Sequence, residues 1–370
     1  MDTITLSDRL LPPLFSQGIT KEEWESKRRR ELLSLFRDAV YGNVPDEQSL
    51  QVSYRVADQQ EGSSIMSGNA LRKSIEVTVS RNGLSHSFAF VLFIPLGKKH
   101  PVPTMLTLCN RGIADADPSR SFLSSFWPAE TIVSQGFAAA VVLTSDIAPD
   151  YDEGFSLGLH KLFPEYKKER PSNLWGALGA WAWALSRILD YLLADPLLDP
   201  EKIGVVGHSR GGKAALWCAA QDTRFALAVS SCSGCTGAAL SRGKGGEHIK
   251  DITERFPYWF CKNYRHYADN EGKLPVDQHM LLALLAPRLV YVSSKTNDAW
   301  ADPQSEFASC VAASEAYRLF GTMGIEEESM PRPEHPLLGG RIGYHLKTGY
   351  HDMDAYDWER YLQFAKRHLE

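Results

Sequence analysis

Short apolar runs that alternate with helical segments constrain the fold of this 370-residue chain more than any other feature. The runs are rich in Val, Ile, Leu and Ala, and they span residues 104–108, 138–143, 203–206, 225–230 and 289–293. Segments with helical patterns lie among them, at 128–135, 174–194, 212 onward and 352–369. Strands buried on both faces have such runs, and strand–helix alternation gives parallel pairing. The sequence therefore predicts an α/β fold with a mostly parallel sheet covered on both faces.

The N-terminal part follows a different pattern. Residues 74–80 and 86–95 alternate apolar and polar side chains around Arg81-Asn82-Gly83, which predicts an antiparallel hairpin. Residues 21–40 form a charged amphipathic helical segment. We therefore expect one domain over residues 1–370, with an N-terminal helical extension over 1–60. The polar and aromatic stretch 231–287 is expected to be an insertion that lies over the active site.

Composition excludes several classes of protein. Hydrophobic residues make up 44% of the chain and charged residues 23%, which supports a large core. A net charge of −5 gives no reason to expect binding to nucleic acid or to an anionic membrane surface. No apolar run approaches the roughly 20 residues of a membrane span, and no secretory signal begins the chain. We expect a monomer, which is cytoplasmic if this start is native and secreted or periplasmic if a signal was trimmed.

The six cysteines are too few and too scattered for a disulfide scaffold. Cys232 and Cys235 form a C-x-x-C pair, but no second pair stands at the spacing of a zinc site. We therefore expect no metal there, and whether these two cysteines pair with each other is left open.

The segment from Ile203 to Lys213 reads I-G-V-V-G-H-S-R-G-G-K and places G-x-S-x-G between a strand and a helix. In that setting the serine stands on a sharp turn whose neighbours must be small, so Gly207 and Gly211 are expected where a Cβ would clash. The turn exposes the Ser209 hydroxyl and directs the Arg210 N–H toward a developing oxyanion. Ser209 is therefore the predicted nucleophile of a hydrolase with the α/β-hydrolase fold.

A serine hydroxyl needs a base, and the base needs an orienting carboxylate. In this fold the base lies on a loop before the last helix, which favours His351 over His345. The acid often follows a late strand, where the chain offers Asp298 and Asp302. Asp302 precedes a proline and has a second possible role as a helix cap, so Asp298 is preferred. His208 is interpreted as a packing residue that points away from the hydroxyl.

Beyond this motif, Ser209-Arg210-Gly211-Gly212-Lys213 resembles the S-R-x-G-K signature of the glucuronoyl esterases, carbohydrate esterase family 15. Further segments resemble its bacterial members: Trp127-Pro128-Ala129-Glu130, Trp175-Gly176-Ala177, Ser233-Gly234 with Gly237, Phe256-Pro257-Tyr258-Trp259-Phe260, Pro275-Val276-Asp277-Gln278-His279 and Trp300-Ala301-Asp302-Pro303. The resemblance runs from about Pro101 to the C-terminus. It implies a three-layer α/β/α sandwich and hydrolysis of the ester between 4-O-methyl-glucuronic acid on xylan and lignin alcohols.

The same resemblance implies roles for individual side chains. Arg210 would stabilise the oxyanion, Lys213 and Glu247 would bind sugar hydroxyls, and Trp300 would contact the uronate ring. Lys213 stands four residues after Ser209, hence on the same helix face. Many family members carry a catalytic glutamate at the position of Cys232, which cannot supply a carboxylate, and this strengthens Asp298. Fungal members have a disulfide-bonded cysteine where this chain has His208.

Two other functions remain open from the sequence. An acetyl xylan esterase would use the same Ser209 and His351, but it would have no evident use for Lys213, Glu247 and Trp300. A catalytically inactive carbohydrate-binding homologue would keep the fold, although intact Ser209 and His351 argue against it. No metal or organic cofactor is implied. The expected partner is a glucuronoxylan or lignin–carbohydrate ester substrate.

Overall fold

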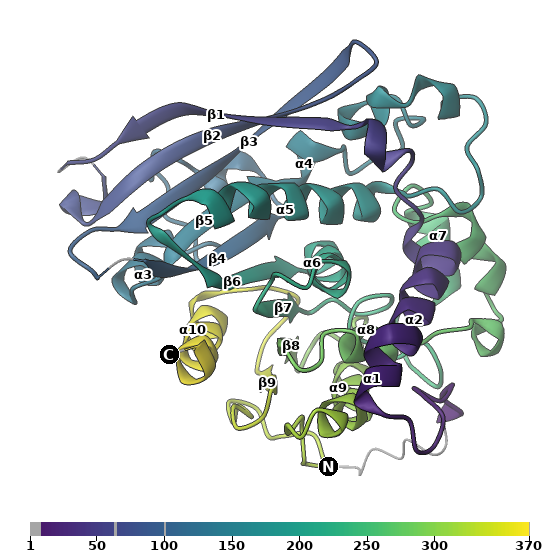
Figure 1. Cartoon of the computed structure of the whole chain (residues 1–370). Helices are drawn as coiled ribbons and strands as arrows, with labels where there is room; N and C mark the ends of the chain where they lie inside the picture. The colour runs from purple at the N-terminus through teal and green to yellow at the C-terminus, as the bar shows by residue number, and fades with distance from the viewer. Residues whose placement is uncertain (1–8, 63–64, 100, 370) are drawn as a thin grey trace.

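The computed structural model describes residues 9–62, 65–99 and 101–369 (Figure 1). In this part of the chain the strands form one nine-stranded sheet in the order β1-β2-β3-β5-β4-β6-β7-β8-β9. The strands are β1 (Gln51–Gln60), β2 (Ala70–Arg81), β3 (Leu84–Pro95), β4 (Val102–Cys109), β5 (Ala138–Leu143), β6 (Leu198–His208), β7 (Leu227–Ser231), β8 (Leu289–Lys295) and β9 (Ile342–Lys347).

The sheet is parallel from β5 through β4, β6, β7 and β8 to β9, whereas β1, β2 and β3 pair antiparallel and β3 joins β5 antiparallel. Arg81 and Leu84 pair across the β2–β3 turn, where Asn82 and Gly83 have φ of 49° and 80°. Two consecutive positive φ values make the hairpin turn that Asn-Gly favours. The predicted mostly parallel sheet with an antiparallel N-terminal hairpin is confirmed.

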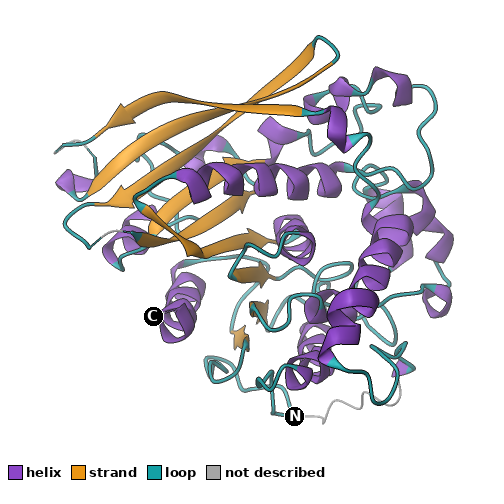
Figure 2. Ribbon diagram, viewed as in Figure 1, coloured by secondary structure: helices purple, strands orange, loops and turns teal. Residues whose placement is uncertain are grey.

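Helices cover both faces of the sheet (Figure 2). The α-helices are α1 (Lys21–Glu23), α2 (Arg29–Phe36), α3 (Ala129–Ser134), α4 (Thr144–Ile147), α5 (Ala177–Ala194), α6 (Arg210–Gln221), α7 (Ile249–Arg255), α8 (Gln278–Ala283), α9 (Pro303–Leu319) and α10 (Ala355–Leu369). Side chains of α5, α6, α8 and α9 share one core cluster, and those of α3 and α10 share the other.

Successive residues of β6 divide between these two clusters, since Val205 belongs to the first and Val206 to the second. Side chains of a strand point alternately to opposite faces of the sheet, so the two clusters lie on opposite faces. The structure is thus the three-layer α/β/α sandwich that the sequence predicted.

The N-terminal extension is helical only in part. Helical turns run through α1, η2 (Trp24–Arg28), α2 and η3 (Arg37–Tyr41). Residues 51–60, which were expected to belong to the helical extension, form the edge strand β1. Val52, Tyr54 and Val56 recur with a period of two, which suits a strand and not a helix. Among the described residues, no helix is both long enough and apolar enough to cross a membrane.

The parallel strands bring distant segments to one edge of the sheet. Strands β6, β7, β8 and β9 end at His208, Ser231, Lys295 and Lys347. Because parallel strands have their carboxyl ends at the same edge, the loops that follow them lie together. The loops after β6, β8 and β9 carry Ser209, Asp298 and His351, respectively.

Candidate active site

Ser209 occupies a strained turn between β6 and α6. Its φ of 54° and ψ of −124° lie outside the regions that non-glycine residues favour. The turn brings the chain against itself, since a Cβ at Gly207 would lie 2.1 Å from the carbonyl oxygen of Gly211. At Gly211 itself the nearest atom would be 3.2 Å away, the carbonyl oxygen of Leu108. The expected clash is therefore severe at Gly207 and mild at Gly211.

This difference gives a stability prediction. Gly207→Ala is expected to lower the free energy of unfolding by about 3 kcal/mol or more, because backbone atoms must move to admit the methyl group. Gly211→Ala should remain within about 1 kcal/mol of wild type, since it also gains helix propensity in α6. Urea unfolding of both variants measures the effect. Equal stability of the two variants would show that the turn between β6 and α6 is not tightly packed at Gly207.

The predicted base and acid meet in the structure. His351 Nδ1 lies 2.6 Å from Asp298 Oδ2, although 53 residues separate the two in the chain. Asp298 is 6% exposed, and its other oxygen accepts a hydrogen bond from the Ala301 N–H at 3.3 Å. Because Asp298 engages Nδ1, the Nε2 atom of His351 is left for a proton acceptor role. Ser209 and His351 line the same cavity.

The rival residues are engaged elsewhere. His345 is fully buried on β9, with Nε2 2.8 Å from Asp357 and Nδ1 3.0 Å from the Tyr291 hydroxyl. Asp302 caps α9, since its carboxylate accepts a hydrogen bond from the Ser305 N–H at 3.1 Å. The sequence left open which of two histidines pairs with which of two aspartates. Neither His345 nor Asp302 belongs to the pair that forms.

A buried ion pair fixes the loop that carries His351. Asp357, at the start of α10, binds Lys295 at 2.6 Å and accepts a hydrogen bond from the Asp354 N–H at 2.8 Å. Burial alone would raise the pKa of Asp357, but its bonds to His345 and Lys295 lower this pKa to about 2. The carboxylate is therefore charged at neutral pH and ties the end of β8 to the segment that follows His351.

The cavity beside Ser209 has a volume of about 210 Å³. Its walls come from the start of α6, the end of β7, the insertion and the β8–α9 loop. They consist of Ser209, Arg210, Lys213, Cys232, Ser233, Gly234, Glu247, Arg255, Phe256, Trp259, Trp300, Ala301 and His351. All four side chains that the resemblance assigned to oxyanion or sugar binding are thus gathered in one cavity.

Arg210 is held from behind by Asp150. Its Nη1 donates to Asp150 Oδ2 at 2.5 Å, and its guanidinium lies 5.2 Å from the ring centroid of Trp259. Asp150 also accepts a hydrogen bond from Trp259 Nε1 at 2.7 Å. The guanidinium is therefore held in one orientation, and its buried Nε–H has no partner among the described residues.

Lys213 is buried behind Ser209. Its ammonium group donates to the carbonyl oxygens of Ser233 and Cys235, the latter at 2.5 Å, and lies 4.0 Å from Glu247 Oε2. Burial lowers the pKa of Lys213. An ammonium group has three donors, so two hold the strand β7 exit loop and the third is left for Glu247 or a ligand.

Glu247 and Trp300 form the opposite side of the cavity. Trp300 Nε1 donates to Glu247 Oε1 at 3.1 Å, and the Glu247 N–H donates to the Trp300 carbonyl at 2.9 Å. The Trp300 side chain remains 46% exposed. These reciprocal bonds leave an indole face at the cavity rim, which is the arrangement that suits contact with a sugar ring.

Sequence reasoning did not assign four residues of the site, namely Asp150, Arg255, Phe256 and Trp259. The aromatic pair belongs to the segment 256–260 that carried the resemblance, and its rings stack with centroids 3.9 Å apart. That segment was a usable signal. Asp150 had none, because its contact with Arg210 spans 60 residues.

Glu306 is a further buried acid behind the cavity. Its Oε1 accepts a hydrogen bond from the Gly234 N–H at 2.9 Å, and its Oε2 accepts one from the Ser294 hydroxyl at 2.6 Å. Burial raises the pKa of Glu306 to about 7. These bonds join α9 to the loop that forms the cavity floor.

His208 is a buried packing residue, as predicted, and its ring lies beside that of His351. The ring is 3% exposed, and it lies 5.8 Å from the Phe126 ring and 4.6 Å from the His351 ring between centroids. Burial lowers the pKa of His208 well below its usual value, so the ring is neutral. All six cysteines lie in the described part of the chain and are buried free thiols, so Cys232 and Cys235 do not pair.

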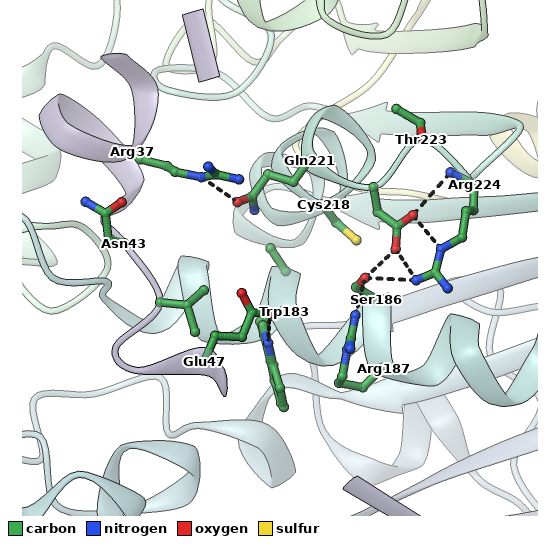
Figure 3. A pocket seen from close by; sticks show the side chains of 13 residues that line it. Arg37, Asn43, Glu47, Trp183, Ser186, Arg187, Cys218, Gln221, Thr223 and Arg224 are labelled. Atoms are coloured by element: carbon green, nitrogen blue, oxygen red, sulfur yellow. Dashed lines mark hydrogen bonds and ion pairs between the residues drawn. The ribbon is translucent and has the colours of Figure 1, made fainter. Parts of the chain in front are cut away.

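A second, larger cavity of about 450 Å³ lies at the far end of α6 (Figure 3). Its polar side chains are bonded to one another: Arg224 to Asp222 at 2.6 Å, and Arg37 to Gln221 at 3.3 Å. Its thiol, Cys218, is buried, and burial raises the pKa of that thiol well above its usual value. None of the described residues that line this cavity is a histidine, whereas Ser209 and His351 both line the other one.

A serine on a strand-to-helix turn, with a histidine–aspartate pair beside it on this sandwich, is typical of a serine hydrolase of the α/β-hydrolase fold. Comparisons with known proteins narrow the class. Residues 77–321 match the family described as "Glucuronyl esterase, fungi". The carbohydrate esterase MZ0003, from an unknown prokaryotic organism, is 35% identical over 99% of this chain and 90% of its own length. The chain belongs to the glucuronoyl esterase family.

Solved structures agree with this membership. A glucuronoyl esterase from Solibacter usitatus has a TM-score of 0.88 and 35% identity, covering 96% of this chain and 97% of its own. A CE15 glucuronoyl esterase from Teredinibacter turnerae has a TM-score of 0.84 and 31% identity, covering 97% of this chain and 89% of its own.

A fungal relative matches in sequence over part of its length. The 4-O-methyl-glucuronoyl methylesterase 1 of Phanerochaete chrysosporium is 29% identical over 81% of this chain but only 58% of its own length.

Proposed function

We propose that this protein hydrolyses the ester of a 4-O-methyl-glucuronoyl group, such as that joining glucuronoxylan to lignin alcohols. The names of its relatives support the acyl group, since several are 4-O-methyl-glucuronoyl methylesterases. One observation carries the proposal: Lys213, Glu247, Arg210 and Trp300 line the same cavity as Ser209 and His351. A cation, a carboxylate and an indole around an esterase nucleophile suit a polar sugar acid.

The proposed chemistry is acyl transfer through Ser209. Ser209 Oγ attacks the ester carbonyl while His351 Nε2 takes its proton, and Asp298 orients and stabilises the imidazolium. The Arg210 N–H at the start of α6 and the Arg210 guanidinium stabilise the oxyanion. His351 then protonates the departing alcohol. Water, deprotonated by His351, attacks the acyl-enzyme. The bond between the acyl group and Ser209 Oγ then breaks, and His351 returns its proton to Ser209 Oγ as the uronic acid leaves.

The rest of the cavity is proposed to hold the sugar. Glu247 accepts hydrogen bonds from hydroxyls, the free donor of Lys213 reaches a ring or hydroxyl oxygen, and Trp300 lies against the ring. Insertion 231–287 contributes Glu247, Arg255, Phe256 and Trp259, which supports its proposed place over the active site. Because these groups contact only the acyl part, the alcohol is held loosely.

The proposal predicts a preference between acyl groups. We expect kcat/KM for benzyl glucuronate to exceed that for an aryl acetate by at least about a hundredfold, or roughly 2.7 kcal/mol. An acetyl group is too small to contact Lys213 or Glu247, so their binding energy cannot orient its carbonyl. Steady-state kinetics with both esters measure the ratio.

Lys213→Ala should reduce that preference by slowing the glucuronate reaction, while acetyl ester hydrolysis changes less. Lys213→Met keeps the stem of the side chain and separates the loss of donors from the loss of packing. Thermal unfolding of both variants shows whether the exit loop of β7 stays folded. Comparable wild-type rates on both esters, or indifference to both variants, would favour a general acetyl esterase.

One comparison supports a broader substrate range as the second function. A marine metagenomic protein described as a promiscuous CE15 esterase has a TM-score of 0.87 and 34% identity, covering 97% of this chain and 96% of its own. The kinetic ratio above decides between the two activities. A third possible function is that of an inactive carbohydrate-binding homologue. Covalent labelling by a fluorophosphonate tests it, because such a homologue would leave the probe unreacted.

A further inference from the structure

Packing alone does not explain why a residue with two polar ring nitrogens occupies position 208. The side chain is 3% exposed, and neither ring nitrogen has a hydrogen-bond partner among the described residues. Phenylalanine or leucine would fill the same space without the cost of burying two unpaired nitrogens. A buried imidazole that no neighbour satisfies is therefore available to a ligand that reaches it.

Two further residues each place a ligand atom close to His208. One donor atom each from His208, Cys232 and His351 lies within 4.8 Å of the others. Of the two nitrogens of His351, Nδ1 is bonded to Asp298, so Nε2 is the one that remains. Cys232 stands at the end of β7 and His208 at the end of β6, two strands that pair side by side. The sheet edge thus brings a thiol and two imidazoles together.

This set of atoms suits a thiophilic divalent cation. Zinc prefers thiolate and imidazole ligands, and its bonds of about 2.0–2.3 Å place tetrahedral ligand atoms about 3.3–3.8 Å apart. Asp298 already holds Nδ1 of His351, and a carboxylate in that position is the usual outer partner of a metal-binding histidine. The Cys232–Cys235 pair does not form the site, because Cys235 Sγ contacts Thr236 Oγ1 at 3.6 Å instead.

We propose that His208, Cys232 and His351 form an inhibitory binding site for Zn²⁺. Binding replaces the thiol proton of Cys232, which is released to solvent, and places the lone pair of His351 Nε2 on the metal. The inhibition rests on the proposed role of His351 as the base, because a metal-bound Nε2 cannot take the proton of Ser209.

The kinetic test is zinc titration of the full chain. Zn²⁺ should abolish ester hydrolysis, and EDTA should restore it. His208→Phe and Cys232→Ala should each raise the half-inhibiting Zn²⁺ concentration at least about tenfold, when each variant is compared with its own metal-free rate. Cys235→Ala is the matched control and should be inhibited like wild type. Equal inhibition of all four proteins would overturn the proposal.

A second measurement does not depend on activity. Co²⁺ added to Ser209→Ala should bind once per chain and produce the near-ultraviolet absorption of a cobalt–thiolate bond. That absorption should disappear in Ser209→Ala/Cys232→Ala and persist in Ser209→Ala/Cys235→Ala. A cobalt–thiolate absorption that persists without Cys232, or no such absorption in any variant, would contradict the proposed metal site. If wild type fails to cleave glucuronate esters, the proposed function falls while this spectrum still reports on the site.

Discussion

Replacing Ser209 by alanine is expected to lower kcat for ester hydrolysis by at least about 10⁴-fold. The proposed mechanism passes through an acyl bond to Ser209 Oγ, and His351 and Asp298 act only through that oxygen. Alanine keeps the Cβ and the backbone of the strained turn, so the variant should unfold at the wild-type temperature. Steady-state kinetics and thermal unfolding on the same preparation separate lost chemistry from lost structure.

Labelling gives an independent check of the nucleophile. A fluorophosphonate should modify wild type once per chain and leave Ser209→Ala unmodified. Retention of more than about a tenth of the wild-type kcat would rule out Ser209 as the nucleophile. A variant that loses activity but unfolds early would instead show that the turn needs the hydroxyl for stability.

Asp298→Asn is expected to lower kcat by about 10³- to 10⁴-fold. The carboxylate accepts a hydrogen bond from His351 Nδ1 at 2.6 Å, which places the free lone pair on Nε2. An amide at this position offers its N–H to the ring and favours the opposite tautomer, and it also removes the charge that stabilises the imidazolium. The loss should appear mainly in kcat, because Asp298 does not line the cavity where the sugar would bind.

Asp302→Asn is the matched control for this prediction. Asp302 lies four residues further on and caps α9, and asparagine is an equally good N-cap, so this variant should stay within about 1 kcal/mol of wild-type stability and keep nearly all of its activity. Kinetics and urea unfolding of both variants distinguish the two roles. A large loss of kcat in Asp302→Asn together with a mild effect in Asp298→Asn would show that the acid has been assigned to the wrong aspartate.

The fold and the strained turn at Ser209 could be predicted because their signals are local. A strand buried on both faces needs a continuous apolar run, and β4, β5 and β7 each carry one. Ser209 was equally predictable, because only small residues permit so tight a turn and Gly207 satisfies that need within two residues. The boundary at residue 51 was missed although its alternation of apolar residues was visible, since the strand lies at a solvent-exposed edge.

The choice between like residues was harder to make from the chain alone. His345 and His351, and likewise Asp298 and Asp302, differ little in local pattern, whereas their environments differ completely. The lengths of the β8 and β9 exit loops decide which histidine and which aspartate reach each other across the sheet edge. Burial then engages His345 with Asp357 and leaves His351 free to pair with Asp298.

The sequence by itself determined the sandwich, the serine elbow and the residue types required around it. Only the tertiary structure placed Asp150 against Arg210 and His208 against His351. The first contact spans 60 residues, and the second joins the end of β6 to the loop after β9. The physical reason is the range of each interaction. Backbone sterics and side-chain periodicity act over a few residues, whereas hydrogen bonds and ring contacts depend on where separate strands end.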